Sequence, residues 1–433
     1  MKNLKIKIIA LLFAFTSSLY AQQTPGEAQK GVISIIGATA HIGNGEIIEN
    51  SLIIFENGKI KHVVDATTSK LSPMGKIIDA SGKHIYPGFI AANTTLGLVE
   101  IDAIRPSNDE DEIGEMLPHV RSIAAYNAES LIVESMRPNG VLVAQIAPRG
   151  GRISGTSSIV QLDAWNWEDA VIKENDGIHI NWPNSFRRGR TWRGEEPGIK
   201  PNEDYTKEIN ELTDFFKNAK AYLAGKRNPK HLPFEAMEAV FSGDKKIFVQ
   251  VDGEKEIIDV INFKKENNLA NIVIVGGYHA NKVAHLLKQE QIPVLVQRVH
   301  SLPSQEDDSP DHPFKLAVLL HQNGVLTGLQ TSGDMERMNT RNLPFYAGTT
   351  VAYGLAKEEA LKLITSNVAK ILGMEKTLGT LETGKDATFF ISEGDALDMR
   401  TNKVTLAFIQ GREISLDTYQ KDLYERYEGK YKK

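Results

Sequence analysis

Hydrophobic and polar positions follow two different patterns along the chain. Near the N-terminus, short stretches rich in Ile and Val or alternating between polar and apolar residues lie at 32–40, 52–55, 59–64, 77–78 and 84–86. The turn Glu56-Asn57-Gly58 joins two of them. Short alternating runs joined by an Asn-Gly turn are typical of antiparallel strands. The first part of the chain is therefore predicted to form a small antiparallel β unit.

The second pattern alternates apolar strands with amphipathic helices. Strands are predicted at 246–251, 271–275, 292–296 and 325–331, and helices at 255–268, 281–290 and 314–322. Parallel strands need long crossovers, which helices usually supply, so this alternation predicts parallel pairing under a helical layer. Two architectures satisfy the pattern: an open doubly wound sheet and a closed (β/α)8 barrel.

The C-terminal part returns to β structure. Apolar spacing predicts helical packing from Glu358, with a break and new cap at Thr365-Ser366-Asn367 and a stop at Gly373. Strand-like runs follow at 387–391 and 404–409. Either one β unit is divided between the two chain ends, or each end forms an unrelated β cap. The charge-alternating tail, 419–433, is predicted to be a surface helix.

Three segments resemble the amidohydrolase superfamily, in particular its imidazolonepropionase-like branch. The segment Gly82-Lys83-His84-Ile85-Tyr86-Pro87-Gly88-Phe89-Ile90 resembles the entry to that family's barrel. The runs 359–373 and 378–387 resemble its closing helices and its return to the small β domain. The resemblance implies an α/β fold with a (β/α)8 TIM-type barrel at 88–373. It also implies a β-sandwich built from 22–87 and 374–418, followed by the tail.

The resemblance further implies a hydrolase for carbon–nitrogen bonds of amides or cyclic amides that uses zinc or another divalent metal. Family members carry Asp-x-His-x-His after Pro-Gly-Phe-Ile, but here Asn93 and Thr95 stand at the two histidine positions. Gln250 ends a strand that commonly supplies another histidine, and Ser332 stands where the metal-bound aspartate is expected. Amide and hydroxyl groups are weak zinc donors. We therefore predict no metal ligands and no bound cofactor.

The remaining candidates come from strand ends, where barrel sites form. Asp334 is the best-placed carboxylate and the candidate catalytic residue; the alternative is a solvated loop acid. His279 follows a strand end, or else packs locally. The segment Gly150 to Ser158 predicts either a structural turn or an anion cradle beside Arg149. The full set of candidate substrate-binding residues is Asn93, Thr95, Arg121, Arg149, Gln250 and His279.

The amino-acid composition excludes several kinds of site and partner. The 433 residues include no cysteine, which excludes disulfides, thiolate zinc sites and cysteine nucleophiles. The formal net charge of -5 gives no reason to expect nucleic acid as a partner. The basic, aromatic segment 184–204 therefore predicts a surface loop rather than a nucleic-acid groove. The acidic run 306–312 lacks the spacing of a calcium loop and predicts a solvated loop.

Residues 1–21 have the features of an export signal: lysines at the start, an apolar run at 8–15 and a small residue, Ala21, at the cleavage position. The apolar run is shorter than the roughly 20 residues of a typical membrane span. The mature chain is therefore expected to be periplasmic or secreted, without a membrane span.

Together these features predict an exported amidohydrolase-superfamily protein that binds a small molecule and whose hydrolysis of carbon–nitrogen bonds is weak, altered or lost. The alternative is a non-catalytic ligand-binding protein, or a partner subunit that forms a hetero-oligomer with an active amidohydrolase paralogue.

Overall fold

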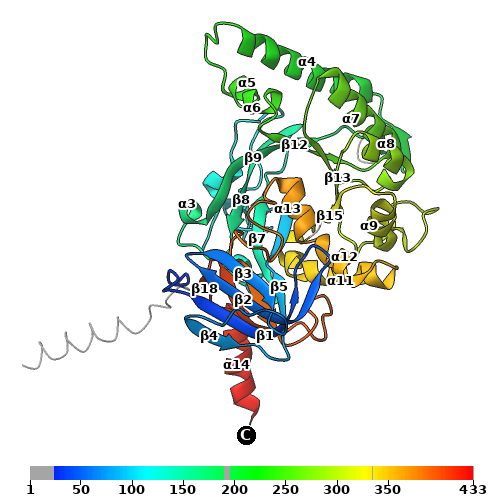
Figure 1. Ribbon diagram of the computed structural model, residues 1–433. Helices are drawn as coiled ribbons and strands as arrows, with labels where there is room; N and C mark the ends of the chain where they lie inside the picture. Colours follow the sequence, from blue (N-terminus) through cyan, green and yellow to red (C-terminus); the bar gives the residue numbers. More distant parts are fainter. Residues whose placement is uncertain (1–23, 190–195, 334, 433) are drawn as a thin grey trace, which may run out of the picture.

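The computed structural model describes residues 24–189, 196–333 and 335–432 (Figure 1). The predicted export signal and the candidate Asp334 lie outside these residues, as does the centre of the basic segment, 190–195. No helix among the described residues is long and apolar enough to cross a bilayer.

A nearly closed barrel forms the body of the protein. Its sheet contains 8 strands in the order β15-β14-β13-β12-β9-β8-β7-β6. A parallel bridge between Ala92 and Gln330 brings the two outer strands together. The strands are β6 (Phe89–Thr94), β7 (Val141–Ile146), β8 (Ile153–Gln161), β9 (Val171–Asn181), β12 (Lys246–Val251), β13 (Ile272–Gly276), β14 (Val294–Val296) and β15 (Thr327–Leu329).

The pattern of strands and helices predicted from 246 onward is present, with parallel pairing from β9 through β12, β13 and β14 to β15. The barrel differs from an all-parallel one at β8, which pairs antiparallel with both β7 and β9. The turn predicted for the segment 150–158 is confined to its first three residues, where Gly150 and Gly151 have positive φ, and the residues from Ile153 onward belong to this fully buried strand. The anion cradle stays a prediction. Small polar side chains gave β8 the composition of a loop.

Alternate residues of the barrel strands face two separate cores. Phe248, Val273 and Val275 belong to an inner cluster that helix α13 (Ser366–Leu372) also joins. Ile272 and Ile274 belong instead to the cluster between the strands and the surrounding helices. The α-helices that precede α13 in the sequence are α2 (Leu131–Glu134), α3 (Trp167–Ala170), α4 (Tyr205–Ala224), α5 (Leu232–Glu235), α6 (Glu238–Phe241), α7 (Glu254–Glu266), α8 (Ala284–Gln289), α9 (His312–Gln322), α10 (Glu336–Asn339), α11 (Leu343–Ala352) and α12 (Lys357–Lys362).

The break predicted near Thr365 is real: α12 ends at Lys362, and Thr365 precedes α13. The helix then stops at Gly373, whose φ of 71° lies in the left-handed region that favours glycine. This geometry turns the chain back toward the terminal sheet.

Both ends of the chain contribute to a second 8-stranded sheet, in the order β18-β17-β16-β5-β1-β2-β3 with β4 beside β1. Its strands are β1 (Ile33–His41), β2 (Ile47–Glu56), β3 (Lys59–Asp65), β4 (Lys76–Asp79), β5 (His84–Pro87), β16 (Phe389–Ser392), β17 (Val404–Ile409) and β18 (Arg412–Glu413). One β unit is thus shared between the termini. It is not wholly antiparallel, since β4 and β5 pair parallel with β1. The pairing defines one sheet, and the sandwich stays a prediction.

Two peripheral elements complete the fold. The basic segment forms a short hairpin of β10 (Phe186–Arg188) and β11 (Ile199–Pro201). The predicted C-terminal helix is α14 (Tyr419–Tyr431), which has no buried residue and projects from the body (Figure 1).

Candidate functional site at the barrel mouth

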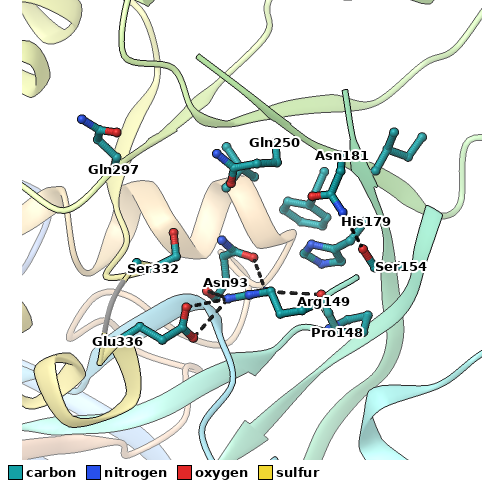
Figure 2. A pocket seen from close by; sticks show the side chains of 14 residues that line it. Asn93, Pro148, Arg149, Ser154, His179, Asn181, Gln250, Gln297, Ser332 and Glu336 are labelled. Atoms are coloured by element: carbon teal, nitrogen blue, oxygen red, sulfur yellow. Dashed lines mark hydrogen bonds and ion pairs between the residues drawn. The ribbon is translucent and has the colours of Figure 1, made fainter. Parts of the chain in front are cut away.

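A cavity of about 330 Å³ opens where the parallel barrel strands end (Figure 2). Its volume lies at the lower end of the range for small-molecule sites. The polar side chains that line it are Asn93, Arg149, Ser154, His179, Asn181, Gln250, Gln297, Ser332 and Glu336, and its apolar lining includes Phe248 and Val275. In a barrel of this type the C-terminal strand ends form the site, so this cavity is the candidate functional site.

Arg149 lies at the centre of the hydrogen-bond network in this cavity. Its guanidinium donates to the side-chain Oδ1 of Asn93 at 3.1 Å and to the Asn93 carbonyl at 2.8 Å. It also donates to both carboxylate oxygens of Glu336, at 3.1 and 3.0 Å (Figure 2). Both contacts to Glu336 come from one nitrogen, Nη2, so they form a branched hydrogen bond between opposite charges, and such charge-assisted bonds are stronger than neutral ones. They tie the end of β6 to the loop after β7 and to α10.

A break in the β6–β7 register aims Asn93 at this network. The register shifts between Ala91 and Thr94, and Asn93 adopts a positive φ of 51°. Asparagine tolerates this conformation better than most residues, which explains its presence in a strand end. The backbone N–H of Asn93 donates to the side-chain oxygen of Gln145 at 3.0 Å, so a side chain inside the barrel stabilises the bend.

Thr95, the second histidine position of the resemblance, is fully buried beneath the cavity and does not line it. Its backbone N–H and its hydroxyl both donate to Glu336 Oε1, at 2.7 and 2.8 Å. Consequently the ion pair contacts both replaced positions, Asn93 through its arginine and Thr95 through its glutamate.

A second carboxyl group lies deeper in the barrel. Asp176 is 2% exposed and accepts hydrogen bonds from the Ser157 hydroxyl at 2.7 Å and from the Gln145 amide at 2.8 Å. Burial raises the pKa of Asp176 above its ordinary value. Because Gln145 also accepts from Asn93, this carboxyl supports the bend that places Asn93.

His179 is the buried imidazole of the cavity. Its ring stacks on Phe248 with centroids 4.9 Å apart, and Nε2 has no hydrogen-bond partner. Burial, followed by the nearby charge of Arg149, lowers the pKa of His179 to about 3. At neutral pH it therefore adds no charge, and the Arg149 and Glu336 charges offset each other.

The structure brings Asn93, Arg149, Gln250 and Ser332 together around the cavity, but it separates the other candidates. Arg121 lies outside the lining, is partly exposed and pairs with Glu174. His279 lines a different cavity, of about 860 Å³, beneath the β10–β11 hairpin. Its Nε2 lies 3.8 Å from Asp308 of the acidic run, and burial lowers its pKa.

Sequence reasoning missed several lining residues, including His179 and Glu336. A usable signal for His179 existed, because Gly177-Ile178-His179-Ile180-Asn181 places His179 and Asn181 on one face of an apolar strand. No motif in the sequence around Glu336 indicates a site residue, because its position depends on how the chain folds back after β15.

The lining does not fit the divalent metal that the resemblance implies. No group of three or more His, Asp or Glu side chains in the described parts of the chain is arranged to hold a metal ion. Catalytic zinc sites usually have three protein ligands drawn from imidazole, thiolate and carboxylate groups. Here the Glu336 carboxylate is engaged by a guanidinium, His179 supplies a single imidazole, and the other strand ends in the lining carry amides and a hydroxyl.

Comparison with known proteins agrees with this architecture. A model of the Amidohydrolase family matches residues 232–414, less than half of the chain. The amidohydrolase from Thermotoga maritima MSB8 has a TM-score of 0.77 at 24% identity, over 88% of this chain and 99% of that one. No curated protein matches the sequence.

Two further solved structures are more distant. A Xaa-Pro dipeptidase with methionine bound in its active site has a TM-score of 0.56 at 13% identity, over 89% of this chain and 100% of that one. A putative prolidase from Bifidobacterium longum has a TM-score of 0.52 at 14% identity, over 93% and 100%. The chain therefore has the fold of the amidohydrolases, with a barrel mouth at the usual end of the strands.

Proposed function

We propose that this chain is an exported member of the amidohydrolase superfamily that binds a small, uncharged polar molecule at the barrel mouth. In this proposal metal-dependent hydrolysis of carbon–nitrogen bonds is weak, altered or lost. The motif at 82–90 supports the imidazolonepropionase-like branch and its β-sandwich, and the apolar run at 8–15 supports export to the periplasm or medium.

One observation carries the proposal: the strand ends around the cavity present hydrogen-bonding groups but no set of metal ligands among the described residues. Asn93, Gln250 and Ser332 stand at positions where the resemblance implies metal ligands. Removing several ligands together is expected to abolish a tightly held ion.

The charge balance of the cavity favours an uncharged ligand. The Arg149–Glu336 pair is neutral overall, and His179 is uncharged near pH 7. The cavity is also lined by the side-chain amides of Gln250 and Gln297 and the hydroxyl of Ser332, which can donate and accept hydrogen bonds. Since a charged ligand would lose its hydration without meeting an opposite net charge, we expect neutral amides or hydroxyl compounds to bind better.

Elemental analysis and activity assays of the same purified preparation test the proposal. We expect zinc, manganese and iron well below one ion per chain, and no hydrolysis of amide, Xaa-Pro dipeptide or imidazolone substrates. Zinc-loaded and chelator-treated samples are the matched controls, and both should remain inactive. One tightly bound transition metal per chain, together with turnover that the chelator removes, would contradict the proposal.

The loss of several ligand types also supports the alternative, a partner subunit of an active paralogue. In that case the protein should copurify with a relative that retains Asp-x-His-x-His. Isolation of the chain alone from its native source, with catalytic turnover, would exclude the partner role.

A further inference from the structure

We propose that Arg149 supplies the fixed cation of this barrel mouth and that Glu336 is its counter-ion, so the pair itself keeps divalent metals out. The inference rests on the proposed function, because it concerns the same cavity. It goes further because it attributes the exclusion of metal ions to the positive charge of Arg149 as well as to the absence of the two histidines.

The contacts of the ion pair support this assignment. The Arg149 guanidinium bonds to the side chain and carbonyl of Asn93, the first replaced histidine position. It also approaches the carbonyls of Ala147 and Pro148, both at 3.3 Å. These acceptors surround a positive charge with oxygen, much as an oxygen-lined site surrounds a metal ion. Figure 2 shows the guanidinium extended between Asn93 and Glu336.

Glu336 completes the arrangement from the opposite side. Its carboxylate accepts from Arg149 and from both the N–H and the hydroxyl of Thr95, the second replaced position. The carboxylate, which is the metal-binding type of side chain in this network, therefore already has three donors at Oε1 and one at Oε2. The side chain of Glu336 is 7% exposed, so little water is available to take the place of these donors.

If the ion pair excludes metals, restoring the two histidines alone should not restore metal binding. The variant Asn93→His/Thr95→His places one imidazole in the cavity lining and one at the buried position beside Glu336, where it replaces the Thr95 hydroxyl, but it leaves the Arg149 guanidinium next to both. A like charge within contact distance of a divalent ion opposes its binding. Adding Arg149→Met removes that charge, keeps a long side chain and releases the Glu336 carboxylate as a third donor, which is the usual number for a catalytic zinc site.

Calorimetric titration with zinc chloride compares the two variants. We expect zinc to bind the Asn93→His/Thr95→His/Arg149→Met variant about a hundredfold more tightly than the Asn93→His/Thr95→His variant. Arg121→Met in the same Asn93→His/Thr95→His background is the matched control, because Arg121 lies outside the cavity lining, and it should leave zinc binding unchanged. Tight zinc binding while Arg149 is present would overturn the inference, even if the natural protein holds no metal and the proposed function stands.

A second measurement does not depend on the folding of the multiple variants. Glu336→Gln in the natural chain leaves the Arg149 charge without its counter-ion, so inorganic sulfate should raise the melting temperature of this variant more than that of the natural protein. Sodium chloride at equal ionic strength separates specific binding from screening. Equal sulfate responses in the two proteins would overturn the inference.

Discussion

Glu336 supplies the negative charge at the barrel mouth, and its replacement by glutamine measures how far the mouth depends on that charge. Glu336→Gln preserves the shape of the side chain but removes the carboxylate charge that bonds directly to the Arg149 guanidinium, so that among the described residues only the nearby Glu110 still opposes the arginine charge. Breaking a buried ion pair by removing one partner typically costs about 3–5 kcal/mol. The Arg149 side chain is 26% exposed and keeps its carbonyl acceptors, so we expect the lower value, about 3 kcal/mol.

This cost converts into a measurable melting shift. With an unfolding entropy of about 2.1 cal/mol/K per residue, a chain of 433 residues has about 0.9 kcal/mol/K, so the melting temperature should fall by about 3 °C. Differential scanning calorimetry at neutral pH gives this value. The double variant Arg149→Met/Glu336→Gln should lose less stability than the sum of the losses in the two single variants, because the two side chains act as a pair.

The matched control is Glu174→Gln, which removes the partner of Arg121. That pair is exposed, with side chains 48% and 41% accessible. Exposed pairs contribute about 0–1 kcal/mol, so its melting temperature should change by less than about 1 °C. If Glu336→Gln shifts the melting temperature no more than Glu174→Gln does, the reasoning about the barrel mouth is refuted.

Two further substitutions test buried groups of the same barrel. Because burial raises the pKa of Asp176, its stabilising contribution is complete below about pH 4 and is lost as the pH rises through the higher folded-state value. Asp176→Asn has no carboxyl group to ionise, so it should not lose stability in this way as the pH rises. In calorimetric scans between about pH 4 and about pH 8, its melting temperature should therefore rise relative to that of the natural protein. A difference in melting temperature that stays constant with pH would contradict the assignment. His179→Phe removes a buried nitrogen that has no partner, a group that typically costs about 1–3 kcal/mol, so the variant should melt about 1–3 °C higher. A lower melting temperature would indicate that the imidazole makes an essential bond.

The sequence predicted those parts of the fold in which each segment carries its own periodicity. The elements from Lys246 to Leu329 have apolar strands and amphipathic helices, and they appear in the expected order. The division of the terminal sheet could also be predicted, because strand-like runs occur at both ends of the chain. The antiparallel strand β8 could not, since it is buried on both faces yet carries Ser154, Thr156 and Ser157, whose composition is typical of loops.

The candidate site shows the same limit. Asn93, Arg149 and Gln250, which line the cavity, could be named as candidates because a resemblance gave their positions a meaning. The position of Glu336 depends on contacts with Thr95 and Arg149, which lie 241 and 187 residues away in sequence. Such long-range pairing leaves no local pattern. Asp334 lies outside the described residues, so its catalytic role stays a prediction.

The metal content of the purified full-length protein is the most direct test of a barrel mouth that holds an arginine–glutamate pair in place of a metal centre. Elemental analysis should find no transition metal near one ion per chain, both as isolated and after incubation with zinc followed by gel filtration. A stoichiometric ion that survives gel filtration and is lost from the Glu336→Gln variant would contradict the account, because it would make Glu336 a metal ligand instead of the counter-ion of Arg149.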